Sequence, residues 1–188
     1  MASRDLDGLR VAIVLDTDFE QVEMTEPRKA LEDAGATCRL ISPRNQVTGV
    51  KHDEKQDTFK VDLPLDRANP DEFDALLLPG GALNADSLRM VKQAQDFVRR
   101  MDQAGKPMAV ICHAPWVLVS SGLAKGRHLT SYHTIQDDMI NAGANWEDRE
   151  VIVDRNLVSS RQPSDIPAFN REMIRLFGES RGRNLRAA

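Results

Sequence analysis

The chain has few of the residues that define the more specialised classes of protein. Only two cysteines and one tyrosine occur among its 188 residues. Two cysteines are too few for a disulfide framework, so we expect Cys38 and Cys112 to be free thiols. No apolar run approaches the length of a membrane span, and the run at residues 9–15 is also too short for a signal sequence. The sequence therefore predicts a cytoplasmic protein with no membrane contact.

Positive charge is not in excess either. The chain carries 25 Lys and Arg against 29 Asp and Glu, which gives a net charge of −4 at pH 7. Nucleic-acid binding normally requires a basic face, so we expect no nucleic-acid partner. Arg181, Arg183 and Arg186 gather at the C-terminal end, which we interpret as a frayed, solvated tail; a nucleic-acid arm is the alternative.

Length and composition are those of an ordinary globular protein. Hydrophobic residues make up 41% and charged residues 29% of the chain, so its length suits one domain with a sizeable core. We expect a single domain over residues 1–188, with its core at about 9–177 and a frayed tail at 178–188.

Apolar segments typical of buried strands alternate with segments of helical periodicity. Strand patterns lie at residues 9–15, 37–41, 75–78 and 108–111, a hairpin pattern at 46–61, and a strand pair at 151–153 and 157–160. Helical patterns lie at residues 26–34, 87–104, 114–121, 134–142 and 164–177, the last with Ser164 as candidate N-cap. This alternation predicts an α/β fold, in which a mainly parallel sheet has helices on both faces and an inserted hairpin beside it.

Cys112 stands where the strand pattern at 108–111 gives way at once to a helical pattern. A side chain at the carboxyl end of a parallel strand faces the crevice above the sheet, and the N-terminus of the next helix favours a thiolate there. We therefore expect the pKa of Cys112 to lie below its usual value. Complete ionisation raises the thiolate fraction at pH 7 by only about thirtyfold, so an enzyme would also need a proton-transfer group and an oxyanion site.

Gly80 and Gly81 end the strand at 75–78, at the same edge of the predicted sheet. Their backbone N–H groups are candidates for binding an oxyanion over Cys112, and a simple chain turn is the alternative. Cys38 lies in an alternating strand pattern and is expected to be structural. The four histidines show no zinc spacing with either cysteine, so we expect no metal and no other cofactor.

Five motifs follow one another along the chain: DFEQVE at 18–23 with Pro27 after it, LPGG at 78–81, ICHAP at 111–115, DDMINAG at 137–143 and SSRQP at 159–163. In this order they resemble the ThiJ/PfpI superfamily, and within it the PfpI branch of intracellular peptidase-like and general stress proteins. The resemblance runs from about residue 9 to residue 177. It implies a flavodoxin-like three-layer sandwich.

The resemblance also implies a strained nucleophile elbow at Cys112, with a carboxylate touching its sulfur. By its spacing to Pro27, Glu23 matches that carboxylate, and Glu20 is the second acid of the same loop. A protonated glutamic acid can donate a hydrogen bond to a thiolate and then shuttle a proton. For both residues the alternative is a solvated loop acid.

His113 matches the general base of the peptidase-like branch. In that branch the acidic partner of the histidine comes from a neighbouring subunit. Asp86 is the best match for that acid, which implies a homodimer or a higher homo-oligomer; a histidine that only packs in the crevice is the alternative. Tyr132 matches a pocket-lining position. The chain departs from the branch at two positions. His133 stands where we expect a proline in the branch, and Ala114 stands where many relatives have glycine. We therefore expect an ordinary backbone conformation at Ala114.

Two functions from different classes follow from these residues. The first is a cysteine-dependent hydrolase, in which Cys112 attacks an aldehyde or acyl carbon while Glu23 or His113 moves protons. Its substrates would be small reactive carbonyls, glycated molecules or peptides, and the sequence does not choose among deglycase, glyoxalase and peptidase activity. The second is a redox sensor or chaperone-like stress protein that works through oxidation of Cys112.

Overall fold

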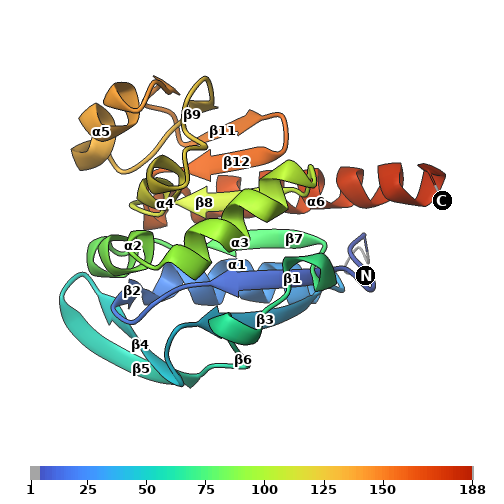
Figure 1. Cartoon of the computed structure of the whole chain (residues 1–188), viewed down its shortest axis with the longest axis horizontal. Helices are drawn as coiled ribbons and strands as arrows, with labels where there is room; N and C mark the ends of the chain where they lie inside the picture. The colour runs from blue at the N-terminus through green and yellow to red at the C-terminus, as the bar shows by residue number, and fades with distance from the viewer. Residues whose placement is uncertain (1–4, 188) are drawn as a thin grey trace.

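A central sheet of seven strands organises the molecule in the computed structural model, which describes residues 5–187 (Figure 1). Neighbouring strands are parallel throughout, except that the edge strand β11 runs antiparallel to β12. From edge to edge the strands are β11 (Val151–Asp154), β12 (Leu157–Ser160), β8 (Met108–Ile111), β7 (Ala75–Leu78), β1 (Arg10–Val14), β3 (Thr37–Ser42) and β6 (Leu63–Pro64).

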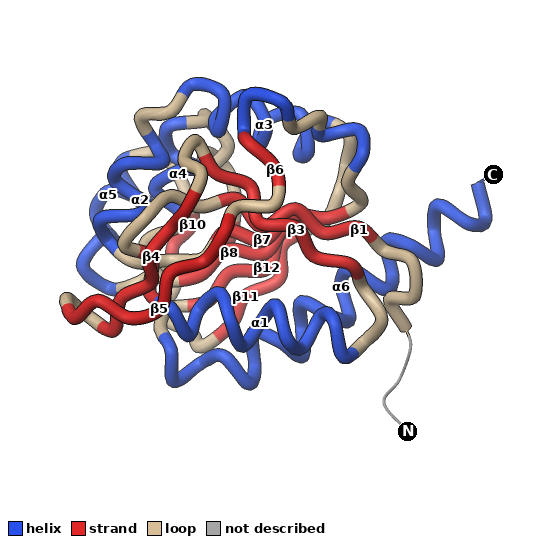
Figure 2. The backbone as a smooth tube through the Cα atoms, turned by 90° about the horizontal axis from the view of Figure 1, so that it is seen from below, coloured by secondary structure: helices blue, strands red, loops and turns tan. Residues whose placement is uncertain are grey.

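Helices cover both faces of this sheet and make a three-layer sandwich (Figure 2). Along β1, Val11 and Ile13 enter the core on one face while Ala12 and Val14 enter the core on the other, as the alternation of side chains along a strand requires. One face is covered by α1 (Gln21–Asp33) and α6 (Ile166–Ala187). The other is covered by α2 (Ala82–Arg89), α3 (Lys92–Gln103), α4 (Pro115–Ser120) and α5 (Gln136–Asn141). The predicted α/β architecture is confirmed.

The predicted hairpin is formed by β4 (Gln46–Lys51) and β5 (Glu54–Lys60), which are antiparallel. It does not extend the main sheet: β4 pairs instead with the short strand β2 (Phe19–Glu20) in a sheet of three strands. This pairing connects the hairpin to the segment that carries Glu20. A further pair of short parallel strands, β9 (His128–Leu129) and β10 (Asn145–Trp146), was not predicted.

Two predicted helices differ from the observed ones near the carboxyl edge of the sheet. Helix α1 begins at Gln21 rather than residue 26, so Pro27 lies inside the helix, where it removes one backbone donor and crowds the preceding turn. The helix predicted at 87–104 is two helices, since Val91 has an extended backbone with φ −82° and ψ 109°. Asp86 therefore lies inside α2 and is not at a helix start.

The last helix also differs from its prediction. Ser164 is not an N-cap but lies inside a 3-10 turn, Pro163–Asp165, that precedes α6. Helix α6 continues to Ala187, so the segment predicted as a frayed tail is helical as far as that residue. Ion pairs from Arg175 to Glu172 and Glu179 support the helix across the predicted boundary. Residues 1–4 and 188, and the side chains of 182–187 with their two arginines, lie outside the described part.

None of the helices described within residues 5–187 combines the length and the apolar character needed to cross a membrane.

Candidate active site

Cys112 directly follows β8 at the carboxyl edge of the sheet. Its φ of 64° places it in the left-handed region, which is unusual for a residue with a Cβ. Ala114 has φ −54° and ψ −31°, so the ordinary conformation expected there is confirmed and the strain of the elbow lies at Cys112 itself. Backbone hydrogen bonds fix the elbow, because Cys112 N–H donates to Ser160 O at 3.0 Å and Tyr132 N–H donates to Cys112 O at 2.9 Å.

Glu23 lies in the first turn of α1 and is completely buried. Burial raises the pKa of its carboxyl group from 4.5 to about 8, although the Cys112 thiol and the Gly80 N–H act to lower it. Neither carboxyl oxygen has a partner of regular hydrogen-bond geometry within the described residues. A pKa of about 8 leaves Glu23 mainly protonated at neutral pH, and its burial means that it is not a solvated loop acid.

Cys112 is only 7% exposed. Burial raises the pKa of its thiol, and an ionised Glu23 would raise it further, while the N–H groups of Gly81 and His113 lower it. This corrects the expectation of a lowered pKa. The helix that follows, α4, has only six residues, so its dipole does little to offset the loss of water around the sulfur. Attack by this thiol at neutral pH therefore requires a base.

His113 is in the position for that base. Its Nδ1 lies 3.1 Å from Cys112 Sγ, which is hydrogen-bonding distance for sulfur. Burial lowers the pKa of His113, and the nearby His133 acts in the same direction. The imidazole is thus neutral at pH 7 and can accept the thiol proton. Tyr132 and Trp116 lie against the ring, with centroid distances of 4.9 Å and 5.3 Å.

The two thiols should differ strongly in their reactivity toward an alkylating agent. Cys38 faces the core under α1, and burial raises its pKa to about 12. Cys112 lines a cavity and has a base beside it. We expect iodoacetamide at pH 7 to modify Cys112 at least about tenfold faster than Cys38. Mass spectrometry of both cysteine peptides over time measures the two rates, and equal rates would contradict a special reactivity of Cys112.

Gly80 and Gly81 let the chain after β7 approach the thiol closely. A Cβ on Gly80 would lie 2.2 Å from Glu23 Oε2 and 2.5 Å from Cys112 Cβ, so only glycine fits there. Gly81 has φ 93°, and its N–H faces the sulfur. The buried Asn84 holds this turn, because its Nδ2 donates to Pro79 O at 3.0 Å and to Gly80 O at 2.9 Å. Sequence reasoning missed Asn84, which follows the LPGG motif by three residues but is not part of it.

A cavity of about 370 Å³ opens above the sulfur. Glu20 lies at the cavity and not at the sulfur, since its Oε2 accepts a hydrogen bond from the backbone N–H of His52 at 2.9 Å in the hairpin turn. The lining residues come from six segments of the chain and are Glu20, Glu23, His52, Gly81, Ala82, Cys112, His113, Tyr132, Gln162, Pro163 and Ser164.

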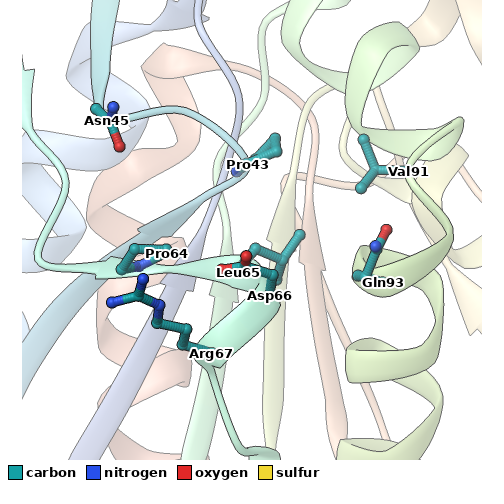
Figure 3. Close-up of a pocket in the computed structure, with 8 residues that line it drawn as sticks. All are labelled: Pro43, Asn45, Pro64, Leu65, Asp66, Arg67, Val91 and Gln93. Atoms are coloured by element: carbon teal, nitrogen blue, oxygen red, sulfur yellow. The ribbon is translucent and has the colours of Figure 1, made fainter.

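The structure thus brings together all but one of the residues singled out in the sequence. Asp86 is the exception, because it is exposed on α2 and does not line the cavity. His52, Ala82 and the segment from Gln162 to Ser164 were missed as cavity residues. A separate cavity of about 340 Å³ lies where β6 ends and α3 begins (Figure 3). Its lining contains no cysteine, histidine or glutamate, so it is not part of this site.

Comparison with known proteins places this geometry in context. The sequence pattern of the DJ-1/PfpI family matches residues 9–176. Deglycase PfpI from Pyrococcus furiosus is 45% identical over 169 residues, which are 90% of this chain and 99% of that protein. Protein/nucleic acid deglycase 2 from Escherichia coli K12 is 41% identical over 170 residues, which are 90% of this chain and 98% of that protein. The crystal structure of Drosophila melanogaster DJ-1beta has a TM-score of 0.80 at 25% identity, over 94% of this chain and 97% of that one.

Proposed function

The chain belongs to the DJ-1/PfpI family, and on this premise we propose that it is a cysteine-dependent deglycase that removes reactive-carbonyl adducts from amines or thiols. The observation that carries the proposal is the placement of the Cys112 thiol between a neutral base and a protonated acid. His113 Nδ1 lies 3.1 Å from the sulfur, and the pKa of Glu23 is raised to about 8. Such a pair suits addition of a thiol to a carbonyl group near neutral pH.

The first chemical step uses all three side chains. As Cys112 Sγ bonds to the carbonyl carbon, the thiol proton passes to Nδ1 of His113. The carbonyl π bond breaks, and the oxygen takes the carboxyl proton of Glu23. The product is a neutral thiohemiacetal beside an imidazolium and a carboxylate. When the C–N or C–S bond of the adduct then breaks, the imidazolium protonates the leaving amine or thiol, and the carbinol oxygen of the adduct becomes a carbonyl as its proton passes to the Glu23 carboxylate. The N–H of Gly81 faces the sulfur and contributes a fixed dipole at the reacting centre.

Turnover of defined adducts tests the proposal. Purified protein is incubated with the methylglyoxal adducts of Nα-acetylarginine and N-acetylcysteine, and with free methylglyoxal as the substrate of a glyoxalase. We expect the free amino acid or thiol to be released at a rate proportional to protein concentration. Loss of free methylglyoxal alone would instead identify a glyoxalase. A protein that transforms none of the three would contradict the proposal.

We further propose a peptidase-like activity that depends on self-association, as the PfpI resemblance implies. Asp86 is exposed on α2 between two large exposed hydrophobic side chains, Leu83 at 66% and Met90 at 77%. The spacing of these three residues places them on one face of the helix. Burial of that face against a second copy would remove apolar surface from water and carry Asp86 toward another subunit, where it could act on His113.

Replacement of Asp86 by alanine tests this arrangement. We expect roughly a tenfold loss of peptide hydrolysis, because His113 loses its charged partner. Stability should change by no more than about 0.5 kcal/mol, since the side chain is exposed. Peptide hydrolysis and urea unfolding are measured beside Ser87→Ala, an exposed neighbour on α2. If light scattering at micromolar concentration finds a fully active monomer, the site is built from one chain.

Oxidation of Cys112 is the second candidate function. The sulfur lines a cavity open to small oxidants, and the N–H groups of Gly81 and His113 that face it could stabilise a sulfenate or sulfinate. In this interpretation the chain acts as a stress sensor and not as a catalyst. It predicts stoichiometric oxidation of Cys112 by hydrogen peroxide in a protein with no turnover of the adducts above.

A further inference from the structure

Both ring nitrogens of His113 have partners in the same chain. Nδ1 lies 3.1 Å from Cys112 Sγ, and Nε2 lies 3.2 Å from Oγ1 of Thr134. Thr134 belongs to the 3-10 turn His133–Ile135. That turn is held beside the elbow because Tyr132 N–H donates to the carbonyl oxygen of Cys112. The hydrogen bond that fixes the nucleophile therefore also holds the Thr134 hydroxyl beside the imidazole.

Resting on the catalytic role proposed for His113, we infer that Thr134 is a positioning residue that keeps Nδ1 of the imidazole directed at the thiol and free to take its proton. A 180° flip of the ring about its Cβ–Cγ bond would place a carbon against the sulfur and a carbon against Thr134 Oγ1. The flip would therefore break both hydrogen bonds. Tyr132 and Trp116 contact the ring but offer it no hydrogen-bond partner, so they do not choose between the two orientations.

The inferred role uses the tautomer in which Nε2 carries the proton, and the Thr134 hydroxyl, which can donate or accept, is the acceptor for it. When Thr134 Oγ1 accepts a hydrogen bond from Nε2–H, Nδ1 has a free electron pair. The Cys112 S–H bond then breaks as an N–H bond forms at Nδ1, and the product is a thiolate beside an imidazolium that keeps Nε2–H on Thr134. The electron pair of the S–H bond stays on sulfur for attack. Thr134 is neutral, so it orients the base without adding a charge.

This role is compatible with an acid from a second subunit. While Thr134 Oγ1 accepts from Nε2–H, its own O–H remains available to donate to a carboxylate. Asp86 of a neighbouring subunit would thus accept a hydrogen bond from Thr134 and act on His113 through that hydroxyl group. Other titratable or charged groups near the ring are Cys112, Glu23, Tyr132, His133 and, beyond Trp116, Arg89. The variants below leave these groups in place.

Thr134→Val and Thr134→Ser separate the hydroxyl group from the shape of the side chain. Thr134 is exposed, so both variants should fold. The first measurement is the rate of iodoacetamide modification of Cys112 at pH 7, which needs no substrate. We expect Thr134→Val to slow it by roughly tenfold and Thr134→Ser to restore most of it. The second is the Nε2–H signal of His113 in ¹⁵N-resolved NMR, which we expect in the wild type and in Thr134→Ser but broadened by exchange in Thr134→Val.

Turnover of the adducts completes the test. In Thr134→Val we expect kcat to fall with the alkylation rate while KM stays the same, since Thr134 does not line the cavity. Wild-type alkylation and an unchanged His113 signal in Thr134→Val would overturn the inference, and so would a serine variant as impaired as the valine variant. A wild-type protein without turnover would overturn the deglycase proposal, yet the alkylation and NMR results would still decide the role of Thr134.

Discussion

Replacement of Cys112 by serine should lower adduct turnover by at least about 10³-fold. Serine keeps the size of the side chain but has a far less acidic and less polarisable nucleophile. Of the side chains that line the cavity, Cys112 is the thiol, and His113 stands beside it as the base. The initial rate of adduct breakdown at pH 7 measures the effect.

The second cysteine provides the matched control. Cys38→Ala removes a thiol that lies in the core under α1 and not in the cavity. Its turnover should equal that of the wild type, although some stability is lost with the buried sulfur. If Cys112→Ser keeps more than about a tenth of the wild-type rate while Cys38→Ala is fully active, covalent catalysis by Cys112 is wrong.

Replacement of Glu23 by glutamine should separate catalysis from stability. The amide cannot give up a proton as a carboxylic acid can, so we expect turnover to fall by about 10² or more. Alkylation of Cys112 should persist, because His113 remains in place. In the wild type, activity should decline above about pH 8 as Glu23 loses its proton. Turnover rates of both proteins between pH 6 and pH 9 test the size of the loss in the variant and the decline of wild-type activity at alkaline pH.

The same variant should be more stable than the wild type at neutral pH. The pKa of Glu23 is raised from 4.5 in the unfolded chain to about 8 in the folded one. The folded state therefore binds more protons between these values, and the stability contributed by this group is complete below about pH 4.5 and is lost as pH rises toward 8. The slope is about 1.4 kcal/mol per pH unit. Glutamine does not titrate, so Glu23→Gln should not lose this stability as pH rises.

Urea unfolding at pH 5 and pH 7.5 measures this difference. The free energy of unfolding of Glu23→Gln, relative to the wild type, should rise by about 3 kcal/mol between the two pH values. If the two proteins show the same pH dependence, Glu23 is ionised in the folded state. It could not then act as the acid.

Much of this site was predictable because its residues lie at strand ends. The strand patterns at 75–78 and 108–111 are enough to place Gly80, Gly81 and Cys112 at one edge of the sheet. Glu23 was found only through its resemblance to a known motif, since no local pattern shows that a carboxyl group will be buried. Its raised pKa comes from its surroundings in three dimensions.

The remaining contacts depend on distant segments. Thr134 lies 21 positions after His113 in the sequence, and nothing in that spacing predicts that the two side chains are in contact. The pKa of Cys112 was predicted in the wrong direction, because a sequence shows the helix that follows a cysteine but not the depth at which the sulfur is buried. The break between α2 and α3 was missed because Met90 and Val91 fit the apolar pattern of one continuous helix.

The left-handed backbone at Cys112 has an evolutionary consequence. Glycine alone adopts this conformation freely, whereas other residues lose roughly 1–3 kcal/mol there. Selection for thermal robustness alone would therefore favour glycine at position 112 and would remove the nucleophile. A cysteine at this position is a compromise between stability and chemistry, and homologues that have lost their activity should drift toward glycine at the elbow.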